Sequence, residues 1–289
     1  MKNLFSIAVH ESPDCVIDMC RNIIYFVPES IIVLHYKKGF NCSIPSDLQE
    51  FVHVNDHQYA TGFMDGSLTI VHLSNLYFII DKKIDFDYFS PFGSNQLFVK
   101  CGFSKYVMQF DSSLVSNFSE SDSQRIVFNK DKELQNLSPN TRFLKSAPEG
   151  TFYRADLVKE FLLKSEVKAW FDSNQANYLS DKSLIFRSLI RQVIRGLRFL
   201  NLAMLIPSKL AKYGYASEEI FFPSFFSGNN CGDKTCFIPW DRESLFVTKD
   251  DVATLSQEES VFYSVKRIER KANDKVRLFI KDIIGNNYE

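Results

Sequence analysis

Two adjacent carboxylates precede an aromatic run in the segment "ASEEIFFPS", residues 216–224. Phe221 and Phe222 favour burial, whereas an ionised carboxylate is costly to bury. One interpretation is a helix that simply starts here. The other is that Glu219 lies at the edge of an apolar pocket and acts as a general base, because apolar neighbours raise the pKa of a carboxyl toward neutrality.

A basic run, "VKRIERKANDKVR", covers residues 265–277. Such a run is usually a solvated helix face, but its side chains can also neutralise an anionic leaving group without a cation. Both interpretations stay open from composition alone. The sequence lacks the motifs G-x-x-x-x-G-K-[ST] and G-x-G-x-x-G, so the usual glycine-rich phosphate loops are excluded.

Two motifs suggest a metal site, and neither is well placed for one. Asp85-Phe86-Asp87 is a D-x-D pattern, and carboxylate oxygens suit hard cations. However, the apolar run 88–92 follows these aspartates, so they lie at the wrong end of the predicted strand. Cys231 and Cys236 have no second Cys/His pair nearby to complete a zinc site. The sequence therefore predicts a solvated turn, two ordinary thiols and no metal.

The N-terminal region predicts a βαβ unit that would position such groups. Residues 4–9 form an apolar run typical of a buried parallel strand, and residues 30–36 form a second one. Between them, Ser12 is a candidate helix cap and Pro13 fits the first helical position. Ligands of such sheets bind beyond the carboxyl ends of the strands, here around His10 and His35.

Further elements follow from the same reasoning. Residues 66–80 predict a buried helix, two extended segments flank "GSNQ", and "EGTFY" predicts a strand followed by a helix. The Ser/Asp-rich segment 111–124 predicts a mobile surface loop.

A basic amphipathic segment occupies residues 182–210. Arg187, Arg191, Arg195 and Arg198 recur at helical spacing and share one stripe. One interpretation is a helix that packs on the core and turns a solvated arginine face outward. The other is membrane contact through residues 182–206 on an anionic bilayer surface.

Composition limits the class of protein and its expected location. The chain has 289 residues, 45% hydrophobic and 24% charged, with a net charge of -1, so a full core is expected and nucleic-acid binding is not. Six cysteines form no regular framework, the N-terminus lacks signal-peptide features, and no apolar run reaches the ~18 residues that span a bilayer. The sequence predicts a cytoplasmic protein.

The order of motifs resembles the core-2/I-branching beta-1,6-N-acetylglucosaminyltransferase family, which also contains peptide-O-xylosyltransferases. The similarity covers nearly the whole chain and is nearest to bacterial members. Its segments, in order, are "LFSIAVHESPDCVIDMCRNI", "IIVLHY", "GSLTIVHLSNL", "SPFGSNQLFVKCGFSKYV", "EGTFYRADLVKEF", "EEIFFPS", "FIPW" and "IERKANDKVRLFI".

This resemblance implies a GT-A-like α/β fold, with a mixed, mainly parallel sheet flanked by helices, and an inverting, metal-independent transfer from a UDP-sugar. Glu219 falls on the family's catalytic base. Arg270 and Lys271 fall on its closing basic pair, and Val9 and His10 lie where the nucleotide is bound. No cofactor is implied.

Lower-ranked acceptor-site candidates are Asn95, Glu149, Arg154, Glu218 and Trp240. Each has a plain structural alternative, such as a turn, a surface charge or a core tryptophan. The chain also departs from the family: His35-Tyr36-Lys37 replaces its His-x-Asp, and the basic helical segment is an insertion.

Together these observations predict a single domain with a nucleotide-binding half (1–100) and an acceptor and catalytic half (101–289), with the helical insertion at about 180–210. The expected function is transfer of a GlcNAc-like or other sugar to a glycan or lipid-linked oligosaccharide in bacterial surface polysaccharide synthesis, at the inner face of the membrane. The alternatives are a non-catalytic sugar- or nucleotide-binding protein and a membrane-associated scaffold.

Overall fold

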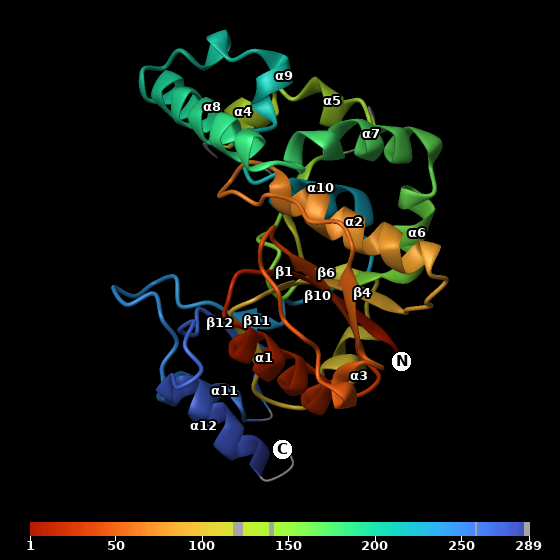
Figure 1. The fold of residues 1–289 in the computed structure, drawn as a ribbon, viewed down its shortest axis with the longest axis vertical. Coiled ribbons are helices and arrows are strands. Elements are labelled where there is room, and N and C mark those ends of the chain that lie inside the picture. Colours follow the sequence, from red (N-terminus) through yellow and green to blue (C-terminus); the bar gives the residue numbers. More distant parts are fainter. Residues whose placement is uncertain (118–123, 139–141, 258, 286–289) are drawn as a thin grey trace.

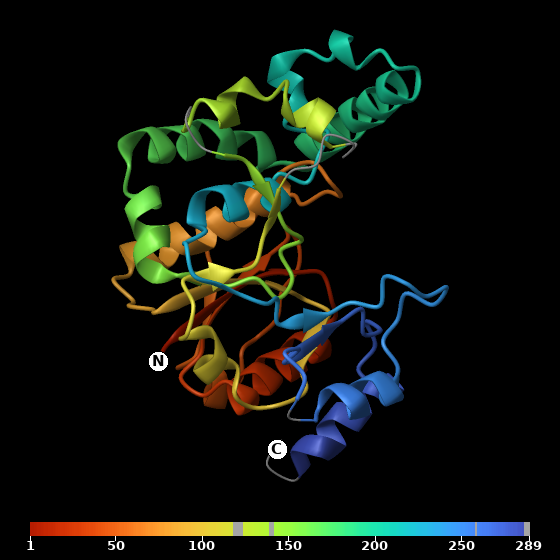
Figure 2. The same cartoon turned by 180° about the vertical axis from the view of Figure 1, so that it is seen from behind.

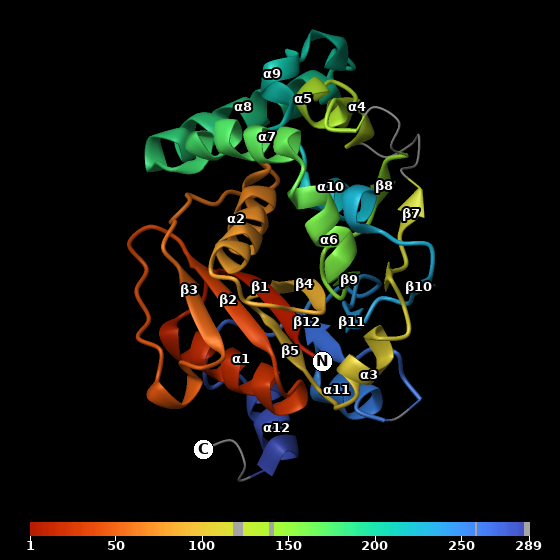
Figure 3. The same ribbon diagram turned by 90° about the vertical axis from the view of Figure 1, so that its right-hand side faces the viewer.

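A seven-stranded sheet forms the centre of the molecule (Figure 3). The computed structural model describes residues 1–117, 124–138, 142–257 and 259–285. The strands, in spatial order, are β10 (Cys231–Gly232), β6 (Ser112–Ser113), β9 (Tyr153–Arg154), β4 (Tyr88–Gly93), β1 (Asn3–Val9), β2 (Ile31–Tyr36) and β3 (Val52–Asn55). Only β9 pairs antiparallel with its neighbours, so this sheet is mainly parallel.

Two smaller sheets lie beside it. In the first, β11 (Cys236–Phe237), β12 (Ser264–Lys266) and β5 (Gln96–Phe98) pair in that order, with β12 antiparallel to β5. In the second, β7 (Ser116–Asn117) pairs with β8 (Leu144–Lys145). The first small sheet matters for function, because it brings the C-terminal basic run next to the N-terminal strands.

Helices cover both faces of the central sheet (Figure 3). One face packs against α2 (Ser67–Asp81), α6 (Ala155–Leu162), α7 (Ser165–Gln175) and α10 (Glu218–Phe226). The other packs against α1 (Pro13–Phe26), α3 (Phe103–Val107), α11 (Lys249–Leu255) and α12 (Lys275–Ile284). Seen from behind, α11 and α12 (blue) lie below the sheet, opposite the green helices (Figure 2).

The remaining helical elements are short, apart from α8 (Asp181–Phe199) at the top of Figure 1. They are η1 (Ser46–Leu48), α4 (Arg125–Phe128), α5 (Lys132–Gln135), η2 (Ala176–Tyr178), η3 (Ala203–Leu205) and α9 (Ser208–Ala211). Helix α8, α9 and α4 lie side by side, away from the central sheet.

Strand β1 divides its side chains between the two cores. Leu4 and Ala8 join the cluster beneath α2 and α10, whereas Phe5, Ile7 and Val9 join the cluster beneath α1 and α12. Successive side chains of a strand point to opposite faces, so an apolar residue at nearly every position indicates burial on both sides.

A buried polar network ties α2 to the sheet. Ser6 Oγ lies 2.8 Å from His72 Nδ1, and Asn75 donates to the same Ser6 oxygen at 2.8 Å. Asn55 in turn donates to Asn75 at 2.8 Å. Burial lowers the pKa of His72 to about 3, so its imidazole is neutral at physiological pH. Satisfied networks of this kind fix a helix in one position on a sheet.

The structure confirms the mixed α/β architecture with a mainly parallel, helix-flanked sheet. It also confirms the first βαβ unit, in which Pro13 occupies the first position of α1; Ser12 stands at the N-cap, but its side chain makes no capping hydrogen bond. The division into a nucleotide-binding half and an acceptor half remains a prediction.

One predicted loop is wrong in part. Within 111–124, Ser112 and Ser113 form the buried strand β6 of the central sheet, and Ser116–Asn117 forms β7. Residues 118–123 lie outside the described part of the chain. Ser112 Oγ accepts a hydrogen bond from the Gly228 amide, which shows how a polar segment is accommodated in the sheet.

The basic helical segment packs on the core through Ile194, as one interpretation expected, but its arginine face is not uniformly solvated; membrane contact remains a prediction. Arg187 is fully buried, and its Nε lies 2.8 Å from Asp65 Oδ2, whereas Arg195 of the same stripe is exposed. The helix ends at Phe199, and Asn201 adopts a left-handed conformation with φ 57°. The exposed face of α8 is instead apolar. Among the described residues, no helix has both the length and the apolar character required to cross a bilayer.

Candidate functional site

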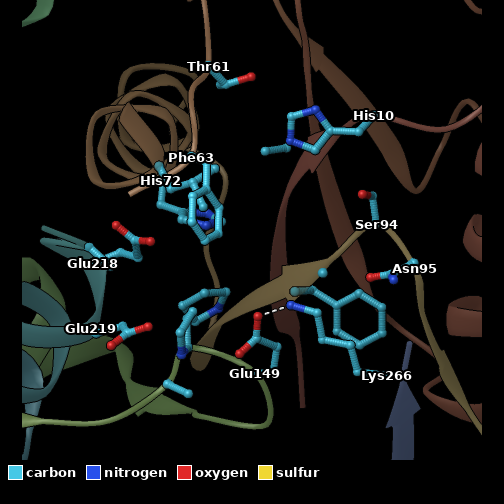
Figure 4. Close-up of a pocket in the computed structure, with 18 of the residues that line it drawn as sticks. His10, Thr61, Phe63, His72, Ser94, Asn95, Glu149, Glu218, Glu219 and Lys266 are labelled. Carbon is cyan, nitrogen blue, oxygen red and sulfur yellow. Dashed lines mark hydrogen bonds and ion pairs between the residues drawn. The ribbon is translucent and has the colours of Figure 1, made fainter. Parts of the chain in front are cut away.

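A cavity of about 560 Å³ opens at the carboxyl ends of β1 and β4 (Figure 4). The chain passes from β1 to β2 on one side, while β4 lies on the other, so the strand order reverses at this point. Ligands of open α/β sheets bind at such a reversal. The lining residues are Ala8, His10, Thr61–Met64, Leu68, His72, Pro91–Asn95, Ala147–Glu149, Ala216, Glu218, Glu219, Trp240, Lys266, Arg267 and Arg270.

The acidic side of the cavity is the start of α10. Glu218 is only 6% exposed, and burial together with the charges of Glu219 and Asp65 raises the pKa of Glu218 to about 8. The sequence predicted a raised pKa for Glu219. The structure gives a raised pKa for the adjacent Glu218. Both carboxyls line the cavity, but the Glu218 side chain is shielded from solvent, whereas that of Glu219 is 25% exposed.

Glu219 faces the cavity from the next position of α10. Its side chain is 25% exposed, so solvent and substrate can reach the carboxylate. Gln124 Nε2 donates to Glu219 Oε2 at 3.0 Å, and Lys145 Nζ lies 3.5 Å from the same oxygen. These contacts hold the carboxylate in one orientation, which a positioned proton acceptor requires.

The basic side of the cavity lies opposite, at the end of β12 (Figure 4). Lys266 forms an ion pair with Glu149 across the cavity floor. Burial and the positive charges of Arg267 and Arg270 lower the pKa of Lys266 to about 7, and the Glu11 carboxylate acts in the opposite direction. Arg267 and Arg270 therefore carry the fixed positive charge of the cavity, and a bound anion would favour the protonated form of Lys266.

Arg270 joins this cluster to the end of β1. Its Nε lies 3.0 Å from Oε1 of Glu11, a fully buried carboxylate, and the His10 amide donates to Glu11 Oε2 at 3.1 Å. Burial lowers the pKa of His10, with Arg270, Lys37 and Lys266 contributing in the same direction and Glu11 opposing it. Glu11 thus positions both the strand end and the guanidinium.

Arg267 has an unusual backbone. Its φ is 74°, in the left-handed region that residues other than glycine rarely adopt. The guanidinium stacks 4.1 Å from the ring centroid of Trp240, which is 60% exposed at the cavity. Such conformations cost roughly 1–3 kcal/mol and cluster at ligand-binding sites.

The structure brings most of the sequence-predicted site residues together. His10, Asn95, Glu149, Glu218, Glu219, Trp240 and Arg270 all line the cavity. Three do not. Val9 is buried in the core, Arg154 pairs with Asp111 and Asp156, and Lys271 is 72% exposed and 3.6 Å from Glu269.

Sequence reasoning named Lys266 and Arg267 only as members of the basic run that could neutralise a leaving group, and it missed His72 as a cavity residue. The first two belong to the basic run, but their approach depends on the pairing of β12 with β5, in which Lys266 lies opposite Gln96. A short strand such as 264–266 gives little local signal. His72 lies on a helix that was predicted, and only its neighbours show that it faces the cavity.

The candidate metal motifs lie elsewhere. Asp85 lies 3.4 Å from Lys159 at the surface, and Asp87 accepts from the Lys2 amide at 2.7 Å, both before β4 begins. Cys231 and Cys236 are free thiols. Among the described residues, no group of three or more His, Cys, Asp or Glu is arranged to hold a metal.

No protein-family model matches this chain. A comparison with curated proteins likewise finds no significant match.

Proposed function

We propose that the protein is a GT-A-like, inverting glycosyltransferase that transfers a sugar from a UDP-sugar to a hydroxyl group of a glycan, without a metal ion. One observation carries the proposal. Glu219 and a cluster of cationic side chains face each other across one cavity, at the edge of the sheet where ligands of this architecture bind.

The arrangement suits a single in-line displacement. Glu219 accepts the proton of the acceptor hydroxyl while the oxygen forms its bond to the anomeric carbon. The bond between that carbon and the diphosphate breaks, and UDP departs with the electron pair. Lys266, Arg267 and Arg270 supply positive charge for the departing diphosphate. In the resemblance Lys271 has this role, but Arg270 and Lys266 are the residues on the cavity wall.

Other lining residues fit substrate orientation. Glu218 is protonated at neutral pH because of its raised pKa, so its carboxyl can donate a hydrogen bond to a sugar oxygen. Asn95 and Glu149 offer further polar contacts, and the exposed ring of Trp240 offers a stacking surface for a sugar face.

The central test is Glu219→Gln. The amide keeps the size of the side chain but accepts a proton poorly, so turnover of the active UDP-sugar should fall about 10²–10⁴-fold. Calorimetric binding of UDP should stay within twofold, because the carboxylate does not contact the diphosphate side. Glu269→Gln, which lies off the cavity, is the matched control and should retain activity.

Two results would contradict the proposal. Unchanged turnover in Glu219→Gln would remove the base. UDP binding by the native protein without transfer or hydrolysis of any UDP-sugar would favour a non-catalytic binding protein.

Metal independence has its own measurement. Because cationic side chains provide the charge at the leaving group, activity should be the same in excess EDTA and in added Mn²⁺. Loss of activity in EDTA that Mn²⁺ restores would instead direct attention to Asp85 and Asp87.

A further inference from the structure

A second cavity, of about 860 Å³, adjoins the first. Phe63 and Met64, in the segment before α2, line both cavities and form the wall between them. Helix α8 provides the opposite side, close to α4 (Figure 1). From α8, the lining includes Arg191, Arg195, Arg198 and Phe199.

Three guanidinium groups face this cavity from successive turns of α8. Arg191 is held in place, since it donates to the Phe63 carbonyl and lies 5.6 Å from the Phe63 ring centroid. Arg195 and Arg198 make no hydrogen bond or ion pair with the residues that the structure describes. The lining contains no carboxylate among those residues. A cluster of arginines with no acidic partner in the described part of the chain favours a phosphate-bearing ligand, because the guanidinium fork matches phosphate oxygens.

The mouth of the cavity is apolar. Phe199 lines it and is 86% exposed, and the outer face of α8 continues from it with large apolar side chains in water. These are Ile185, Phe186, Leu189 and Val193, and the exposed Met204 and Leu205 lie beyond the end of α8, in η3. Helical periodicity sets these α8 side chains on the side opposite Arg187, Arg191 and Arg198, and Phe199 lies between the two stripes. An exposed apolar surface of this extent usually contacts a hydrophobic partner.

We infer that the second cavity binds the phosphate or diphosphate group of a lipid-linked acceptor, whose hydrocarbon chain runs over the outer face of α8. The inference deepens the proposed function and rests on it, since it makes the acceptor an amphiphilic phosphate ester. The arginines of the cavity match the phosphate group. The exposed apolar face of α8, reached past Phe199, matches the hydrocarbon chain. The shared wall at Phe63 and Met64 places the attached sugar toward Glu219.

The test uses farnesyl diphosphate, a soluble isoprenyl diphosphate, as the probe in calorimetry with the native protein. Inorganic pyrophosphate and farnesol are the two matched probes, which carry only the charge or only the hydrocarbon. Farnesyl diphosphate should bind at least tenfold more tightly than either. Equal affinity for pyrophosphate, or equal affinity for farnesol, would overturn the inference.

The double variant Arg195→Glu/Arg198→Glu should weaken farnesyl diphosphate binding at least tenfold. The control Lys182→Glu/Lys209→Glu makes the same charge change at exposed positions outside the cavity and should shift affinity less than twofold. An equal loss in both variants would indicate a diffuse electrostatic effect and overturn the site. Arg195→Gln/Arg198→Gln repeats the test with a milder change, should the charge reversal prevent folding.

A third variant separates the two halves of the ligand. Phe199→Ser should weaken farnesyl diphosphate and leave pyrophosphate affinity unchanged, and an unchanged affinity for both would exclude the hydrocarbon path. UDP affinity reports on the first cavity and should be the same in all variants. Failure of the proposed catalysis would appear in the Glu219→Gln turnover, whereas failure of this site would appear in probe binding alone.

Discussion

Replacing Glu218 by Gln should change how stability depends on pH. The carboxyl is buried at the start of α10, and its pKa rises from 4.5 to about 8 because burial disfavours the charged form. Below pH 4.5 the carboxyl is protonated in both the folded and the unfolded chain. Between pH 4.5 and about 8 the unfolded chain releases the proton and the folded chain retains it, so the free energy of unfolding decreases as pH rises. Above pH 8 this decrease ends.

The size of the effect follows from the same values. One pH unit of difference in pKa corresponds to about 1.4 kcal/mol, so the native protein loses on the order of 5 kcal/mol between pH 4.5 and pH 8 through this group. By pH 7 the loss is about 3 kcal/mol. Glutamine stays neutral and has the same shape, so the variant should lack this loss. Its stability relative to the native protein should therefore increase by several kcal/mol from pH 5 to pH 9.

Urea unfolding of both proteins at pH 5, 7 and 9 measures this difference. Glu160→Gln, at an exposed position of α6, is the control and should give a curve parallel to that of the native protein. Parallel curves for Glu218→Gln as well would refute the reasoning. They would show that the folded protein holds Glu218 ionised, and Glu218 would then be no hydrogen-bond donor to a sugar at neutral pH.

Two stability predictions concern other parts of the fold. Arg187→Met should lower the free energy of unfolding by about 3–5 kcal/mol, because it leaves the Asp65 carboxylate buried and unpaired; the exposed Arg195→Met should change it by less than about 0.5 kcal/mol in the same urea titration. Gly150→Ala should destabilise more than Gly39→Ala. Both glycines have positive φ, which costs another residue about 1 kcal/mol, but a Cβ at Gly150 would lie 2.3 Å from the Cys236 nitrogen, whereas Gly39 faces open space. Equal losses in thermal unfolding would show that the contact at Gly150 relaxes freely.

The first βαβ unit could be predicted from the sequence because its signals are local. The apolar runs at 4–9 and 30–36 are long enough to indicate buried strands, and Ser12-Pro13 marks the start of α1. Glu219 could be selected for the same reason, since its aromatic neighbours adjoin it in sequence. Arg270, on the other side of the cavity, was predicted from the order of motifs in the resemblance and not from any local sequence pattern.

Other features depend on contacts between distant segments. Strand β6 consists of two serines, which are ordinary loop residues, and it forms because β9 and β10 enclose it. The assignment of Lys266 to the cavity depends on β12 pairing with β5, which lies more than half the chain away. Likewise, the neighbour of Glu219 has the raised pKa, because packing decides which of two adjacent carboxylates is desolvated.

The orientation of α8 shows that an amphipathic sequence pattern is compatible with two orientations of the helix on the protein. Periodicity identifies an arginine stripe and an apolar stripe but does not say which one faces the protein. Here Arg187 decides, since Asp65, Ser183 and the carbonyls of Ala60 and Asn177 together accept the hydrogens of its guanidinium. This hydrogen-bonded arginine, together with the buried Ile194, fixes the orientation of α8 and leaves Ile185, Leu189 and Val193 in water. Apolar surface contributes roughly 25 cal/mol of stabilising free energy per Å² when it is removed from water. Contact with a hydrocarbon chain would therefore stabilise this exposed face of α8.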